Sequence, residues 1–123
     1  MPRSTKQSAR TMPTELPRKL VILDEALADL REIARYAASR AKNAERGAAF
    51  AKRLLDRSAA IARSTARLGR PRPEFGHDLR SAPHLGYLIF FRYSGDRVEV
   101  VAFIHGARDL AVAFAERQER YEP

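Results

Sequence analysis

The order and spacing of the apolar residues predict an α+β domain in which an antiparallel sheet packs on a helical hairpin. Two long segments, 24–41 and 43–68, carry apolar residues at helical spacing, and three short segments rich in β-branched and aromatic residues follow them. Helices followed by a run of strands are typical of this class. With one strand before the first helix and a short helix at the end, the expected order is β-α-α-β-β-β-α.

The expected fold begins after a polar, basic segment. Residues 1–17 contain Ser, Thr, Pro and basic residues without an apolar period, so we expect a disordered tail ahead of one domain over 18–123. The sequence leaves open whether Met1 or Met12 is the natural start. The run KLVIL, residues 19–23, predicts the first strand because it is short, apolar and rich in β-branched residues.

Residues that suit helix ends delimit the two helices. Asp24 is a suitable N-cap for the first helix and Asn43 for the second. Gly69, followed by Pro71, is a typical stop signal after the second helix. The link of one or two residues between the helices predicts an antiparallel hairpin.

A Pro/Gly-rich loop over 69–78 separates the second helix from three strands. We expect these strands at 79–83, 87–93 and 98–105. Asp109 is a suitable N-cap for the short C-terminal helix.

The turn between the last two strands fixes how they pair. Gly95-Asp96 suits a two-residue turn with glycine first. The resulting register pairs Tyr93 with Val98, Phe91 with Val100, Ile89 with Ala102, and Tyr87 with Ile104. This face is almost wholly apolar and is expected to pack on the helices. The second face carries Leu88, Phe90 and Arg92 opposite Phe103, Val101 and Glu99. One hairpin of helices covers one face, so the second face needs the C-terminal helix, a partner chain, or both.

The basic composition suits an anionic partner or solubility alone. The formal net charge is +8, and residues 1–19 supply half of it, with five basic residues against one acidic residue. Such a charge suits nucleic acid or an acidic partner, or simply increases solubility. Because no recognition-helix or RNP pattern is present, we expect no direct sequence-specific DNA binding by this chain.

No sequence feature indicates a membrane span, a metal or a cofactor. There is no cysteine, no run of eighteen apolar residues and no apolar leader, so we expect a cytoplasmic protein. His77 and His84 lack metal-ligand spacing, and no glycine-rich phosphate loop is present.

Three segments carry a resemblance to a known family: KLVIL at 19–23, DEALADLREIARYAASRA at 24–41, and LGRPRPEFGHDLRSAPHLGYLIFFRYSGDRVEVVAFIHGARD at 68–109. The chain resembles the ParE branch of the RelE/ParE superfamily of small bacterial toxins over about residues 18–110. The family order β-α-α-β-β-β agrees with the order derived above from periodicity. The resemblance implies the toxin of a type II toxin–antitoxin system, held inactive by a ParD-like antitoxin whose C-terminal segment wraps around it.

The resemblance implies two alternative targets. ParE-like members poison DNA gyrase, whereas RelE-like members cleave mRNA in the ribosome. Cleavage would need cations around the scissile phosphate and an acid/base pair. The candidates for these roles are Arg80, Arg92, His105 and Arg108. RelE-like nucleases also carry lysines before the first sheet arginine, and RPRPEFGHD has none. Arg92 also faces Glu99, so we expect a gyrase inhibitor without catalytic residues, with mRNA cleavage as the alternative.

Two sets of residues are candidates for binding partners. An apolar anchor beside charges is a common interface arrangement, and the C-terminal part offers Arg108, Phe114 and Arg117 for the target. The half-apolar second face and the basic second helix offer Leu88, Phe90, Phe103, Arg53 and Arg57 for the antitoxin. Purely structural roles are the alternatives for His105 at a strand end and for Arg108 and Asp109 beside a helix start.

Overall fold

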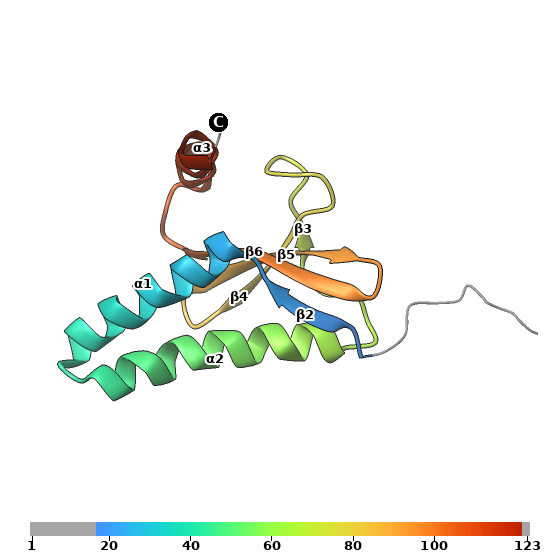
Figure 1. Ribbon diagram of the computed structural model, residues 1–123. Helices are drawn as coiled ribbons and strands as arrows, with labels where there is room; N and C mark the ends of the chain where they lie inside the picture. Colours follow the sequence, from blue (N-terminus) through green and yellow to red (C-terminus); the bar gives the residue numbers. More distant parts are fainter. Residues whose placement is uncertain (1–16, 122–123) are drawn as a thin grey trace, which may run out of the picture.

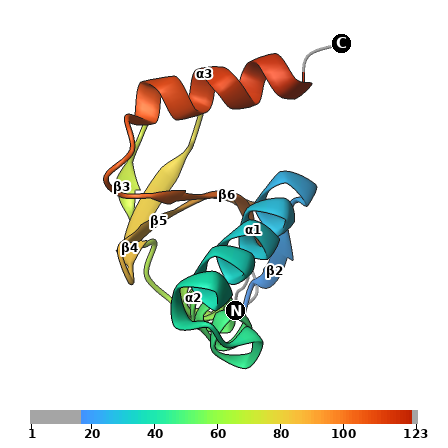
Figure 2. The ribbon, with the colours of Figure 1, turned by 90° about the vertical axis from the view of Figure 1, so that its left-hand side faces the viewer.

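A computed structural model describes residues 17–121 and contains a five-stranded mixed sheet between a helical hairpin and a single C-terminal helix (Figures 1 and 2). The elements are β2 (Lys19–Ile22), α1 (Asp24–Ala41), α2 (Ala44–Arg63), β3 (Arg70–Pro71), β4 (Arg80–His84), β5 (Tyr87–Ser94), β6 (Arg97–His105) and α3 (Leu110–Tyr121). This order confirms the predicted α+β fold and adds the two-residue strand β3. The tail predicted for 1–17 lies, up to residue 16, outside the described residues.

The strand order in the sheet is β2-β6-β5-β4-β3. The predicted strands β4, β5 and β6 pair antiparallel, as expected, and the unpredicted β3 also pairs antiparallel with β4. The first strand, β2, lies parallel to the last, β6, with Lys19 beside Arg97 and Ile22 beside Val100. The beginning of the described chain therefore lies beside the β5–β6 turn. None of the helices described is long and apolar enough to span a bilayer.

A β-bulge in β6 changes the predicted pairing of the last hairpin. The register is as predicted from Tyr93–Val98 to Phe91–Val100, but beyond it Phe90 pairs with Ala102 and Ile89 with Phe103. One extra residue on β6 reverses which face each later side chain occupies. The bulge makes four predicted pairs wrong, along with the face predicted for Phe103: Ile89–Ala102, Tyr87–Ile104, Leu88–Phe103 and Phe90–Val101.

Each face of the sheet has its own hydrophobic core. The core under the helical hairpin includes Leu30, Leu54, Ile61, Ile89, Phe91 and Phe103. The core under α3 includes Leu79, Phe90, Ala102, Ile104 and Ala113. Here the ring of Phe114 stacks on Phe75 at 4.8 Å and meets Phe90 edge-on at 4.9 Å between centroids. The C-terminal helix thus covers the second face, which is one of the two covers expected from the sequence.

Two of the three predicted N-caps are confirmed. Asn43 Oδ1 accepts a hydrogen bond from the Arg46 amide at 3.0 Å, and Asp109 Oδ1 accepts one from the Val112 amide at 3.2 Å. Asp24 is instead the first residue of α1, and Leu23 is the N-cap without a side-chain bond. The Leu23 amide continues the β2–β6 pairing by donating to the Val100 carbonyl, so the chain is still extended at residue 23.

Helix α2 ends at Arg63 rather than at the predicted residue 68. The segment 64–69 is not helical and is held by the sheet. Tyr93 Oη accepts from the Leu68 amide at 2.8 Å, and Arg80 donates to the carbonyls of Leu68 and Gly69 at 2.6 and 2.9 Å. These bonds to the sheet hold the backbone at residues 68 and 69 outside a helix, although the spacing of the apolar residues up to Leu68 had predicted helical bonds there.

Candidate functional site: the groove between α1, β6 and α3

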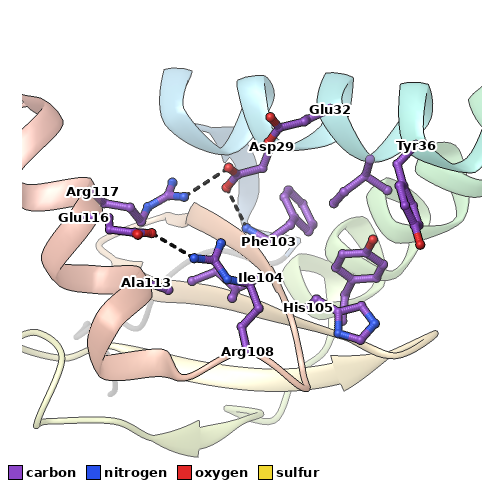
Figure 3. A pocket seen from close by; sticks show the side chains of 12 residues that line it. Asp29, Glu32, Tyr36, Phe103, Ile104, His105, Arg108, Ala113, Glu116 and Arg117 are labelled. Carbon is purple, nitrogen blue, oxygen red and sulfur yellow. Dashed lines mark hydrogen bonds and ion pairs between the residues drawn. The ribbon is translucent and has the colours of Figure 1, made fainter.

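A groove of about 570 Å³ runs between α1, β6 and α3 (Figure 3). Helix α1 contributes Asp29, Glu32, Ile33 and Tyr36, and α3 contributes Ala113, Glu116 and Arg117; the sheet and the turn after it contribute Tyr87, Phe103, Ile104, His105 and Arg108. The groove combines an aromatic and apolar floor with charged walls, which suits a protein segment better than a small apolar ligand.

Arg117 links α3 to α1 and to the bulge of β6 through an ion pair and a hydrogen bond. Its Nη1 lies 3.0 Å from Asp29 Oδ1, and its Nη2 donates to the Val101 carbonyl at 3.1 Å. The second oxygen of Asp29 accepts from the Phe103 amide at 2.9 Å, and Glu25 lies 3.5 Å from Arg117 Nε. The side chains of Arg117 and Asp29 are only 11 % and 14 % exposed. Arg117 is therefore mainly a structural residue, because its charge is paired with two carboxylates and its N–H groups donate to Asp29 and Val101.

Replacing Asp29 with alanine should lower the free energy of unfolding by about 3 kcal/mol. The change leaves the largely buried guanidinium of Arg117 without its nearest carboxylate. It also leaves the Phe103 amide without a hydrogen-bond acceptor. Urea denaturation measures the loss.

Asp56→Ala is the matched control for Asp29. It also removes a helical aspartate that pairs with a cation, but Asp56 and its partner Lys52 are 59 % and 71 % exposed. This variant should change stability by less than about 0.5 kcal/mol, because water solvates both charges of an exposed pair. Equal effects of the two substitutions would contradict a structural role for the Asp29–Arg117 pair.

Arg108 stands at the mouth of the groove and remains accessible. Its Nη2 lies 2.8 Å from Glu116 Oε1, but both side chains are about half exposed. An ion pair this exposed contributes little stability because water solvates both charges. Arg108 can therefore exchange Glu116 for a partner's acceptor at small cost.

Tyr87 and His105 lie side by side in the lining of the groove. Their rings meet edge-on at 5.1 Å between centroids, and His105 Nδ1 accepts from the Ala107 amide at 3.1 Å. Burial raises the pKa of Tyr87 above its usual 10.0, and the nearby Tyr36 raises it further. Tyr87 is therefore a neutral phenol at physiological pH.

Three aromatic residues of the groove also line a second hollow. This hollow, of about 460 Å³, shares Tyr36, Tyr87 and His105 with the groove and adds Arg40 and Phe50. Tyr36 is largely exposed and belongs to both. A bound segment could therefore follow α1 from one hollow into the other.

The four candidates for mRNA cleavage are not brought together. Arg80 lies beside Phe91, whereas His105 lies beside Tyr87, four residues away on β5, which is about 13 Å of strand. Arg80 is engaged by two backbone carbonyls, and Arg92 donates to Glu99 at 2.8 Å, the pairing that the sequence predicted. His105 and Arg108 line the groove without the two sheet arginines.

The candidates for antitoxin binding differ in accessibility. Phe90 and Phe103 are buried on opposite faces, and Leu88 is partly buried. On α2, Arg53 is exposed and Arg57 is partly exposed, and no carboxylate among the side chains described for residues 17–118 forms an ion pair with either. The two arginines are thus the more accessible polar members of this set, and antitoxin binding by all five stays a prediction.

Several groove residues were missed by reasoning from the sequence. Asp29, Glu32 and Tyr36 recur at intervals of three and four residues, which places them on one side of α1, and Glu25, which pairs with Arg117, lies one turn before them. That spacing is a polar stripe beside the apolar one, and it could have indicated the groove wall. Over the residues that the structure covers, no cluster of three His, Cys, Asp or Glu side chains is arranged to hold a metal ion.

Comparisons with known proteins agree with this geometry. A family model described as the ParE toxin of the type II toxin–antitoxin system parDE matches residues 20–110. A chain of the chromosomal ParDE toxin–antitoxin system from P. aeruginosa superposes with a TM-score of 0.59 at 16% identity, covering 72% of this chain and 96% of that one. A chain of the toxin–antitoxin complex RelBE2 from Mycobacterium tuberculosis superposes with a TM-score of 0.54 at 17% identity. The match covers 73% of this chain and 99% of that one. At these identities the two structures share the fold. No curated protein sequence matches the chain.

Proposed function

The chain belongs to the ParE toxin family of type II toxin–antitoxin systems, and from this premise we propose that it inhibits DNA gyrase by docking on it. A cognate ParD-like antitoxin neutralises it, and both events take place in the cytoplasm. The toxin acts by occupying a surface of its target and performs no bond cleavage itself.

This proposal rests on the wide separation of the candidate nuclease residues Arg80 and Arg92 from His105 and Arg108. A nuclease must gather its cations and its proton-transfer groups around one phosphate. Here Arg80 is bound to the carbonyls that end the 64–69 segment, and Arg92 is paired with Glu99. His105 is left with Arg108, at the far end of β5 from both. This arrangement supports inhibition by binding over the RelE-like alternative.

The docking surface is the mouth of the groove with the outer side of α3. Arg108 supplies an exposed cation that is weakly engaged. Phe114 packs against Phe75 and Phe90, so it holds α3 on the sheet, and it is only partly buried. Arg117 contributes indirectly, because it fixes α3 against α1.

The antitoxin contacts a different surface. Arg53, which is exposed on α2, and the partly exposed Arg57 suit the acidic flanks of an antitoxin tail. The two similar structures come from toxin–antitoxin assemblies, ParDE and RelBE2, which supports a protein partner of this kind.

The proposal predicts the outcome of two parallel assays. The purified chain should inhibit gyrase supercoiling of a relaxed plasmid at micromolar concentration or below, and it should leave mRNA intact in a translating ribosome extract. Adding the product of the adjacent antitoxin gene should restore supercoiling. Cleavage of mRNA at the ribosomal A site with unaffected gyrase would replace the proposal with the alternative function.

A further inference from the structure

An arginine cluster at the end of α2 is separate from the groove. Residues 57–73 contain five arginines and no Asp or Glu. The fold adds Arg18 to them, because its amide donates to the Ala62 carbonyl at 3.2 Å and its side chain to the Ser64 carbonyl at 3.3 Å. Figure 1 shows the start of β2 beside the end of α2. We call Arg18, Arg63, Arg67 and Arg70 the arginine cluster.

Tyr93 is the centre of this cluster. The guanidinium carbons of Arg18 and Arg67 lie 4.8 and 4.5 Å from the centroid of its ring. The ring attracts each cation through its quadrupole, but the two cations repel each other. An anion bound beside them would relieve that repulsion.

The positive charge of the cluster is not compensated by any carboxylate within the part of the chain that the structure describes. No ion pair joins any of its four arginines to a carboxylate there, whereas Arg92, Arg97, Arg108 and Arg117 are all paired. Arg63, Arg67 and Arg70 are exposed. Beside them is a hollow of about 440 Å³ lined by Arg67 and Arg80 and by Asp78, whose carboxylate lies 3.1 Å from His77 Nε2.

The surface has the character of a phosphate-binding site rather than a protein interface. Protein interfaces depend on large apolar or aromatic anchors, and the exposed large apolar residues of the described chain, Leu27, Tyr36, Leu55 and Val112, all lie elsewhere. Interfaces with DNA are more polar and far more positively charged. Single-stranded bases would need a free aromatic ring for stacking, and the ring of Tyr93 is already covered by arginines.

We propose that the arginine cluster binds the sugar–phosphate backbone of duplex DNA without sequence preference. The choice of DNA as the duplex rests on the proposed function, since gyrase acts on DNA. The contact would hold the toxin at the DNA segment beside its target, while the groove and α3 engage the protein itself.

The test measures DNA binding without gyrase, so its outcome is independent of the proposed target. A fluorescein-labelled duplex of about 25 base pairs of mixed sequence is titrated with the full chain, purified free of antitoxin, at several salt concentrations. We expect micromolar affinity at about 50 mM salt and a steep decrease as salt increases, because binding releases condensed counterions.

Arg63→Gln/Arg70→Gln is the informative variant, because among the side chains described for residues 17–118 neither arginine has a hydrogen bond or ion pair that folding would lose. It should weaken binding about tenfold and reduce the slope of log K against log salt by about 2. Arg31→Gln/Arg35→Gln removes the same charge from the exposed side of α1 and should bind almost as the parent does.

Three outcomes would overturn the proposal. The first is equal loss in the two double variants, which would show that net charge alone attracts DNA. The second is unchanged binding in Arg63→Gln/Arg70→Gln. The third is tighter binding of a labelled poly-glutamate peptide than of the duplex at the same salt, which would assign the cluster to an acidic protein.

Discussion

Gly47→Ala is expected to lower the free energy of unfolding by about 2 kcal/mol, although alanine favours a helix more than glycine does. A Cβ atom at this position would lie 2.6 Å from Ala38 Cβ and closer still to the carbonyl oxygen of Ala34. Both belong to α1, so the clash is with the facing helix and not with a flexible side chain. Overpacking of this kind costs about 1–3 kcal/mol or more, which outweighs the gain of about 1 kcal/mol in helix propensity.

The neighbouring position provides the control for Gly47. Ala48 is exposed on the same turn of α2, so Ala48→Gly should cost about 1 kcal/mol through propensity alone. Urea denaturation of both variants measures the difference. If Gly47→Ala stabilised the protein by about 1 kcal/mol, the two helices could not be packed as closely as the structure has them.

Arg108→Ala is expected to raise the concentration needed for half-inhibition of gyrase at least tenfold, with the fold intact. The side chain is 51 % exposed and its ion pair with Glu116 contributes little in water. Stability should therefore change by less than about 0.5 kcal/mol. In the proposed complex the same cation is desolvated against the target, and losing it there would cost about 2 kcal/mol.

Arg97→Ala is the matched control for Arg108. Its side chain is 47 % exposed and also pairs with a glutamate, Glu99 at 3.3 Å, but it lies at the other end of β6. This variant should inhibit gyrase as the parent does. Full inhibition by Arg108→Ala would remove Arg108 from the docking surface, and equal loss in both variants would indicate a general charge effect.

The sequence by itself determined much of the fold, because its signals are local. The bounds of α1, the caps at Asn43 and Asp109, the β5–β6 turn and the Arg92–Glu99 pair depend on neighbouring residues or on one tight turn. Helical and strand spacing also gave the order of the elements, and the resemblance over residues 18–110 agrees with the family match over 20–110.

The tertiary structure decided the features that join distant parts of the chain. The bulge in β6 leaves the Phe103 amide and the Val101 carbonyl to Asp29 and Arg117, which lie 74 and 16 residues away in the sequence. That bulge moves Phe103 into the first core and Ile104 into the second, which no alternation pattern could show. The end of α2 likewise depends on Tyr93 and Arg80, and the groove depends on where Arg117 holds α3. In each case a buried or half-buried polar group pairs with a residue far away in the sequence. The periodicity of apolar residues gives no information on such pairs.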